Sequence, residues 1–295
     1  MDMTPALKRS VHWLGICLSV AATTFVLMRL RNYYQTFSLS DYDSFFWIAI
    51  IGLALVYGIA NILLGLAWWA VLRQLGISTT HRWAIKTYGL TQLAKYVPGN
   101  IFHLAGRQII GIAEGLPGLP LAKSAIWELV FLILAGALTG SLAIPCLLYE
   151  FSTKASIIAF TCAVCVLVFG ISRSLGAWFA RAFILHCVFL VISGLVFAGI
   201  ISLLVNNPRF LLWPELWGAF ILAWLAGLVT PGAPAGAGIR EWVLILLLNK
   251  TIGENILLLA IVLGRLTTVI GDMAFFSYAF VLKKQTAFPE SSGTD

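Results

Sequence analysis

The sequence KYVPGNIFHLAGRQ, from Lys95 to Gln108, and the sequence GLVTPGAPAGAGIREW, from Gly227 to Trp242, decide how this chain folds. Each places a Pro-Gly pair inside an apolar segment, where proline removes a backbone donor and breaks a helix. Each also has an arginine nine residues after that proline, so the two stretches read as copies of one motif, 133 residues apart. The alternative is that an arginine follows each kink by chance. The shared positions are Pro98, Gly99 and Arg107 in the first copy and Pro231, Gly232 and Arg240 in the second.

The composition around these stretches is that of a membrane protein. Of the 295 residues, 60% are hydrophobic and only 11% are charged, and the mean hydropathy is +0.95. Soluble domains need about 25% charged residues to meet water, so most of this exterior must meet lipid. The same numbers exclude disorder, a disulfide-rich secreted scaffold and a typical nucleic-acid binder. The formal net charge of +7 is then expected at the lipid headgroups.

Six segments are long and apolar enough, or nearly so, to cross a bilayer, which takes about 20 residues. The first resembles a signal peptide, but no clear small-residue cleavage site follows it, so we expect a retained anchor. Tryptophans near many segment ends are typical of an interfacial belt. The six expected spans are Val11–Met28, Phe45–Leu72, Leu121–Leu148, Ser156–Ile171, Ala182–Val205 and Ile256–Leu282.

The two broken segments, Trp83–Ala113 and Trp213–Leu248, either span or dip in and return as re-entrant hairpins. Backbone freed by a break cannot face lipid, so both breaks must be buried in protein or line a wet cavity. With re-entrant hairpins and a cytoplasmic N-terminus, eleven Lys and Arg lie inside and five outside; with full spans the numbers are nine and seven. The positive-inside rule favours the hairpins. The first then enters from the cytoplasm and the second from the opposite face, which is the inverted repeat of many transporters.

Charged residues at membrane depth mark the candidate site, because such groups are costly in lipid and usually face a bundle interior. Arg265 and Asp272 are two helical turns apart, and His103 and Arg107 are one turn apart with Asn100 a turn earlier, so each set shares a helix face. We interpret Lys95 as snorkelling to the interface and His186 as a satisfied core histidine. The candidate residues are Asn100, His103, Arg107, Arg240 and Arg265 for an anionic headgroup, and Glu128, Glu241 and Asp272 as their partners.

These deep charges have two interpretations. One is that they pair off only to hold the bundle together, for instance Arg240 with Asp272 or Arg107 with Glu128. However, the four deep cations, counted with Lys95, outnumber the three acids, which leaves one positive charge. The other interpretation is that a phosphate satisfies that charge, because the guanidinium fork matches phosphate oxygens and a half-helix after each break adds free N–H groups.

Other chemistries find little support in the sequence. The pair Cys162 and Cys165 has no second pair or histidines to complete a zinc site. The run PGAPAGAG lacks the Gly-Lys-Ser/Thr ending of a P-loop and follows no strand. No catalytic triad and no HExxH helix is present, so we expect no cofactor and no metal.

The stretches LTQLAKYVPGNIFHLAGR (Leu90–Arg107) and TPGAPAGAGIREWVLIL (Thr230–Leu246) are similar to the two signature stretches of the lysylphosphatidylglycerol synthase transmembrane-region family. The second match is looser, because Ala233–Gly238 replaces a Gly-Gly-Leu-Gly-like run, although Arg240-Glu241 is retained. The resemblance extends over essentially the whole chain. It implies a polytopic inner-membrane protein like the domain that moves aminoacylated phosphatidylglycerol between leaflets. It also implies that this chain makes no lysyl lipid, because only a short polar tail follows the last span.

The sequence thus predicts an all-α polytopic membrane protein in a single domain, 1–283, with repeat halves of about 45–150 and 177–283 and a polar tail, 284–295. The leading hypothesis is a non-catalytic flippase-like transporter in the prokaryotic inner membrane, with both termini cytoplasmic. It would hold an anionic phospholipid or a polyprenyl-phosphate headgroup. The alternatives are a membrane glycosyltransferase, or an accessory subunit that presents a lipid-linked sugar to one, with Glu128 or Asp272 as general base, and a scaffold whose buried ions only specify packing.

Overall fold

The computed structural model describes residues 42–96, 102–147, 152–207, 209–210, 213–229, 239–283 and 287. Within these ranges all regular structure is helical, and five helices are long and apolar enough to cross a membrane. They confirm five of the six expected spans, while Val11–Met28 lies outside the described residues. The five are α2 (Ser44–Gln74), α5 (Gly118–Gly140) with its extension η3 (Ser141–Ala143) and α6 (Ile144–Leu147), α7 (Thr153–Ser174), α8 (Ala177–Val205) and α11 (Glu254–Val281).

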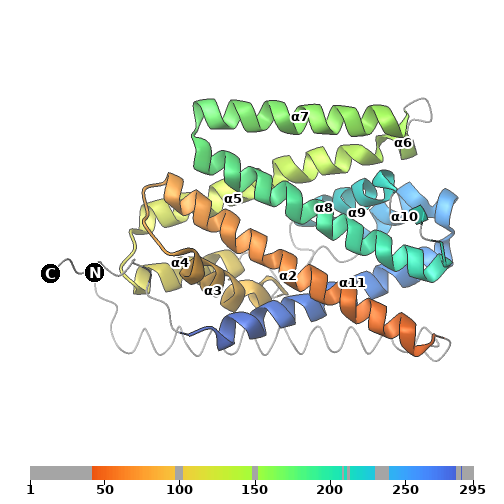
Figure 1. Cartoon of the computed structure of the whole chain (residues 1–295), viewed down its shortest axis with the longest axis horizontal. Coiled ribbons are helices and arrows are strands. Elements are labelled where there is room, and N and C mark those ends of the chain that lie inside the picture. The colour runs from red at the N-terminus through yellow and green to blue at the C-terminus, as the bar shows by residue number, and fades with distance from the viewer. Residues whose placement is uncertain are drawn as a thin grey trace.

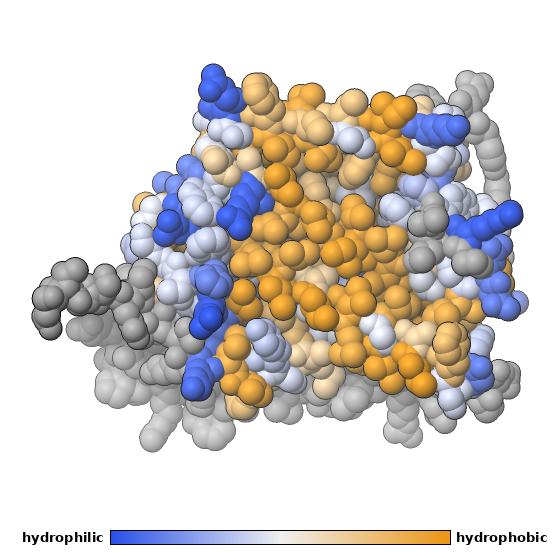
Figure 2. Space-filling view, in the orientation of Figure 1, coloured by the Kyte–Doolittle hydropathy of each residue, from blue (hydrophilic) through white to orange (hydrophobic). Residues whose placement is uncertain are grey.

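The surface of the bundle has the pattern that a bilayer requires. A hydrophobic zone crosses the middle of the molecule, and hydrophilic residues gather at its two ends (Figure 2). Large apolar side chains such as Ile59, Val166 and Phe169 are about two-thirds exposed. A soluble protein rarely exposes so large a patch, whereas lipid tails cover it without cost. The long axes of the helices therefore run across the membrane.

The two broken segments form hairpins of short helices. The first comprises α3 (His81–Thr91), η2 (Gln92–Tyr96) and α4 (Phe102–Ala113), and the second comprises α9 (Pro214–Val229) and α10 (Ile239–Ile252). None of these helices reaches the roughly 20 residues that a span needs. The first hairpin lies at the end of the bundle where α2 ends and α5 begins, and the second lies at the opposite end, where α8 ends and α11 begins (Figure 1). Both are therefore re-entrant and enter from opposite faces, as the sequence predicts.

The order of elements repeats in the two halves of the chain. A long helix, two short hairpin helices and a second long helix occur first as α2 to α5 and again as α8 to α11. Each hairpin packs on a long helix of the other half: α3 of the first half contacts α11 of the second, and α9 of the second half contacts α5 of the first. Helix α7 stands outside the repeat at one edge of the bundle (Figure 1). This arrangement is the inverted repeat expected from the two Pro-Gly motifs.

Small residues bring α2 and α11 close together. A Cβ on Gly271 would lie 2.5 Å from the carbonyl oxygen of Ala54 and 2.9 Å from the nitrogen of Gly58. Close backbone approach at small residues is a common way for membrane helices to associate, because lipid provides no hydrophobic drive between them. The contact fixes the depth and rotation of α11, and thereby of Asp272, the residue after Gly271.

Two details concern the ends of the expected segments. Trp83, at the start of the first broken segment, is one of the tryptophans expected in the interfacial belt, but it is 1% exposed and its ring stacks on Trp68 at 5.6 Å between ring centres. Of the expected polar tail, 284–295, only Ala287 is described, and it is buried. Its N–H donates to Glu114 Oε2 and its carbonyl accepts from the N–H of Thr80, both at 3.2 Å. At this residue the chain is packed against the end of the bundle.

Candidate functional site: a charged cavity between the hairpins

A cavity of about 150 Å³ lies between the two hairpins and the long helices α2, α5, α8 and α11. A single water needs about 15 Å³ of such space, so the cavity has room for several waters or a small polar headgroup. Leucine, phenylalanine and tryptophan side chains line much of it. The titratable groups on its wall, tyrosines apart, are Lys95, His103, Glu128, Arg240, Arg265 and Asp272.

The first hairpin carries a buried ion pair next to this cavity. Arg107 on α4 lies with its Nη1 2.7 Å from Glu128 Oε2 on α5, and the two side chains are 1% and 2% exposed. The guanidinium carbon lies 4.1 Å from the ring centre of Tyr88, whose hydroxyl donates to Glu128 Oε1 at 2.9 Å. Glu128 lines the cavity and Arg107 lies behind it. Arg107 therefore holds this carboxylate through Nη1, and its Nη2 is buried with no hydrogen-bond partner in the described chain.

Asp272 of α11 is the centre of a second network. Its Oδ1 accepts from Asn61 Nδ2 at 3.2 Å and from Gln92 Nε2 at 3.0 Å. Its Oδ2 accepts from the hydroxyl of Tyr96 and lies 2.7 Å from Lys95 Nζ. An ionised carboxylate has about four acceptor positions, so all of them are occupied. Because its partners come from α2 and η2, this fully satisfied carboxylate ties the first hairpin to two long helices.

The second hairpin carries a corresponding ion pair, in which the acid and the arginine have exchanged helices. Glu241 on α10 accepts from Arg265 on α11 through one oxygen, Oε1, at 2.8 Å from Nη2 and 3.1 Å from Nε. The side chains of Glu241 and Arg265 are 18% and 20% exposed, so this pair is more accessible to solvent than the Arg107–Glu128 pair. In each half an acid and an arginine join the second hairpin helix to the following long helix. In the first half the arginine is on the hairpin, and in the second half the acid is.

Arg240 is different from the other deep cations. It lines the cavity, and its guanidinium carbon lies 6.0 Å from the ring centre of Trp224 on α9. Its Nε is buried and has no hydrogen-bond partner in the described chain. Within the described ranges the three acids near the cavity are each paired with another cation: Lys95, Arg107 or Arg265. The surplus positive charge expected from the sequence thus falls on Arg240.

The comparisons with known proteins do not identify the chain. It matches no protein-family model, no curated protein and no solved structure. The similarity of its two Pro-Gly stretches to the lysylphosphatidylglycerol synthase transmembrane-region family therefore remains a prediction. The chemistry of the cavity has to be inferred from its own residues.

Most of the predicted site residues that the structure describes gather around this one cavity. The residues that line it are His103, Glu128, Arg240, Arg265 and Asp272. The other two are paired with residues of that lining: Arg107 with Glu128, and Glu241 with Arg265. Five predicted positions lie outside the described residues: Asn100, Pro98, Gly99, Pro231 and Gly232. His186 is buried in the core, as predicted, with its Nδ1 2.8 Å from the carbonyl oxygen of Ala182. It is not fully satisfied, because its buried Nε2 has no hydrogen-bond partner in the described chain.

Two of the expected roles are corrected. Lys95 does not snorkel to the interface, because Asp272 holds its ammonium at the cavity wall. The suggested pair of Arg240 with Asp272 is wrong for the same reason, since Lys95 occupies that carboxylate. The suggested pair of Arg107 with Glu128 is confirmed.

Sequence reasoning missed the uncharged partners. Asn61, Gln92, Tyr88 and Tyr96 complete the two networks around Asp272 and Glu128. Asn61 offered a signal, because an amide in the middle of the apolar helix α2 is costly unless it finds a partner. The tyrosines offered none, since a tyrosine near a helix break also fits an interfacial position. In the described part of the chain no group of three or more His, Cys, Asp or Glu is placed to hold a metal ion.

Proposed function

We propose that this protein is a membrane lipid transporter that holds the phosphate of an anionic lipid headgroup in the cavity between its hairpins. Arg240 is the phosphate-binding residue. The single observation that carries the proposal is its position: a cation at a cavity wall, with a buried Nε that lacks a partner and no carboxylate within ion-pair distance in the described chain.

The chemistry of the side chain supports a phosphate ligand. A guanidinium presents parallel N–H groups that match two phosphate oxygens, and charge-assisted bonds of this kind are about twice as strong as neutral ones. An unpaired cation at membrane depth is energetically unfavourable, and a bound anion would offset much of that free-energy penalty. The cavity volume suits a headgroup but not acyl chains, which would remain in the bilayer.

The architecture supports movement between leaflets. The hairpins enter from opposite ends (Figure 1), and residues of both line one cavity. Each hairpin also contacts a long helix of the other half. Inverted repeats of this kind expose a central site to one side and then to the other by rocking of one half against its partner. Arg107 and Glu241, held in ion pairs behind the wall, would keep the hairpins rigid during that motion.

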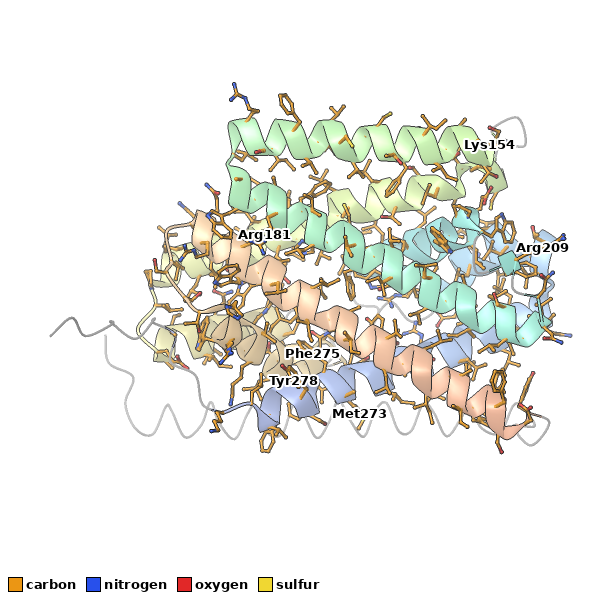
Figure 3. The ribbon with its side chains drawn as sticks, in the orientation of Figure 1. Lys154, Arg181, Arg209, Met273, Phe275 and Tyr278 are labelled. Atoms are coloured by element: carbon orange, nitrogen blue, oxygen red, sulfur yellow. The ribbon has the colours of Figure 1, made fainter. Side chains whose placement is uncertain are left out.

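The charges at the two ends support a cytoplasmic location for the end that carries the first hairpin. Arg181 lies at that end, whereas Lys154 and Arg209 lie at the other (Figure 3). By the positive-inside rule, the side with more Lys and Arg faces the cytoplasm. The cations in helix ends and loops on the first side are Arg73, Arg82, Lys86, Lys123, Arg173, Arg181 and Lys283. This orientation, and a place in a prokaryotic inner membrane, agree with the family resemblance.

The glycosyltransferase alternative needs a carboxylate that is free to take a proton. Asp272 has every acceptor position filled, and Glu128 is bound by Arg107 and Tyr88. A base so engaged must first lose a partner before it can act. The transporter therefore fits the observed bonds better.

Reconstitution tests the proposal. The purified chain is placed in phosphatidylcholine vesicles that contain phosphatidylglycerol or polyprenyl phosphate with a fluorophore that dithionite bleaches only in the outer leaflet. The wild type should let nearly all fluorescence bleach for at least one of the two lipids. Arg240→Ala should slow this about tenfold or more, as expected for the loss of a charge-assisted bond. Arg209→Ala, which removes an exposed arginine at the end of the bundle, is the matched control and should leave the rate unchanged.

Three results would overturn the proposal. The first is equal lipid movement by wild type and Arg240→Ala. The second is lower yield of Arg240→Ala with an unchanged rate per folded molecule, which would favour the scaffold. The third is turnover of a sugar-phosphate donor by purified protein that moves neither lipid, which would favour the enzyme.

A further inference from the structure

Two arginines from different helices share one pair of tryptophans at the end of the bundle that carries the first hairpin. The guanidinium carbon of Arg73 lies 5.8 Å from the ring centre of Trp69 and 5.3 Å from that of Trp178. The guanidinium carbon of Arg181 lies 5.8 Å and 5.6 Å from the same two centres. Both guanidinium carbons are thus within 5.6 Å of the ring centre of Trp178, so they are at most about 11 Å from each other.

The tryptophans form a firm platform for these cations. Their rings meet edge to face, 5.2 Å between centres and at 79°. The Nε1–H of Trp69 donates to the carbonyl oxygen of Thr79 at 2.8 Å, which fixes the orientation of that ring. The ring of His81 packs edge-on against Trp69 at 6.0 Å. A cation over an indole is held by the ring while its N–H groups stay available to an oxygen ligand.

No acid neutralises this arginine pair in the described part of the chain. The three ion pairs of the described residues involve neither Arg73 nor Arg181. At this end of the described chain, Glu114 accepts from the N–H of Ala287. Both Arg73 and Arg181 are exposed. Two like charges held on one platform repel each other, and an anion between them would remove that repulsion.

The pair lies at the depth of the lipid headgroups. Helix α2 has 31 residues, about 46 Å at a rise of about 1.5 Å per residue, which exceeds the roughly 30 Å hydrocarbon core. Arg73 is in the last turn of α2, and Arg181 is in the second turn of α8. Figure 3 shows Arg181 at the end of the molecule where α2 ends, and hydrophilic residues gather at that end in Figure 2. Tryptophan is enriched at this level of a membrane.

We propose that Arg73 and Arg181, with Trp69 and Trp178, form a binding site for the phosphate of an anionic phospholipid at the edge of the bundle. The lipid would lie along α2 and α8, with its headgroup against the two guanidinium groups and its glycerol beside the indoles. Since α2 and α8 begin the two halves of the repeat, the bound lipid would link those halves at one face. Neither arginine lines the central cavity, so this site does not depend on the transport proposal.

Native mass spectrometry of the purified full-length chain in detergent tests the site. Phosphatidylglycerol, phosphatidylcholine and inorganic phosphate are titrated in separate arms. The titrations use Arg240→Ala as the parent protein, so that the proposed cavity site does not contribute. This parent should retain phosphatidylglycerol in preference to phosphatidylcholine, and adding Arg73→Gln/Arg181→Gln should weaken the tightest phosphatidylglycerol site about tenfold or more. The control Arg82→Gln/Arg173→Gln removes the same charge from exposed residues at the same end and should change that affinity by less than about twofold.

Each remaining outcome is decisive. Equal loss of affinity in both double variants would mean a general surface-charge effect and would overturn the site, as would no loss in either. Inorganic phosphate bound as tightly as phosphatidylglycerol would overturn the assignment to a lipid. If the glutamine pair does not fold, Arg73→Lys/Arg181→Lys keeps the charges but loses the planar fork. It should bind phosphatidylglycerol more weakly than the Arg240→Ala parent does, and an affinity equal to that of the parent would contradict the proposal.

Discussion

Lys95 Nζ lies 2.7 Å from Asp272 Oδ2, and this ion pair joins the inner end of the first hairpin to the middle of α11. The two residues are 177 positions apart and belong to different halves of the repeat. Because Asn61, Gln92 and Tyr96 fill the other acceptor positions of Asp272, the pair is part of a closed network. The network neutralises two of the deep charges. Of the described cations Lys95, Arg107, Arg240 and Arg265, only Arg240 has no carboxylate of the described chain within ion-pair distance.

Asp272→Asn should destabilise the protein by leaving Lys95 without its counter-ion. Breaking a buried pair costs about 3–5 kcal/mol, and we expect about 3 kcal/mol because Lys95 is 23% exposed. The midpoint of thermal unfolding in detergent should fall by roughly 5–10 °C. Lys95→Met/Asp272→Asn removes both charges and should recover about 1–3 kcal/mol relative to the sum of the single changes. Strict additivity of the single changes would contradict the pairing.

Gly58→Ala should destabilise the bundle by about 1–3 kcal/mol, because the added methyl would lie 2.8 Å from the carbonyl oxygen of Gly271. Gly52 lies on the same helix, and a methyl there would meet no atom within 4 Å, so Gly52→Ala is the matched control. Alanine favours a helix over glycine, so the control should be neutral or more stable by up to about 1 kcal/mol. Thermal unfolding of both variants gives the comparison, and equal effects would refute the close helix approach.

The sequence predicted the hairpins and the inverted repeat because a few residue types decide them. A Pro-Gly pair favours a break in a helix, and lipid forbids an exposed break. The sequence also predicted one surplus cation, since that follows from counting. It did not predict which cation, because Lys95, Arg107, Arg240 and Arg265 are equivalent until distances are known. The choice between them depends on contacts such as Gly58 with Gly271, which set the position of α11 and which no periodicity contains.

Tyr88→Phe should cost about 1–2 kcal/mol of stability, because it removes the hydroxyl that donates to the buried carboxylate of Glu128. Tyr278→Phe is the control, since Tyr278 is half exposed on the outer side of α11. The same thermal unfolding measurement applies. If the two variants unfold together, Tyr88 does not support the Arg107–Glu128 pair.

Cysteine labelling should place Arg181 on one side of the membrane and Lys154 and Arg209 on the other. In a variant without the five native cysteines, single cysteines at these positions are tested in oriented vesicles with a maleimide that does not cross the bilayer. Arg181→Cys and Arg173→Cys should label from the same side, and Lys154→Cys and Arg209→Cys from the opposite side. Labelling of all four from one side would refute the spanning of α7 and α8.

Sequence reasoning found the charged half of the site more readily than the uncharged half. A buried charge is conspicuous in an apolar chain, and its cost demands a function or a partner. Gln92 and Tyr96 precede a helix break and look like ordinary hairpin residues, yet both donate to Asp272. Their roles follow from the packing of the first hairpin against α11, which brings residues from the two halves together.

The most direct test of the central claim is an experimental structure of the protein in nanodiscs that contain the lipid it moves. We predict density for a phosphate in the cavity, with an oxygen within about 3 Å of an Arg240 guanidinium nitrogen, while the Lys95–Asp272 and Arg107–Glu128 pairs stay intact. A lipid-loaded nanodisc with no phosphate at Arg240, or an Arg240 side chain paired with a carboxylate of the chain, would contradict it.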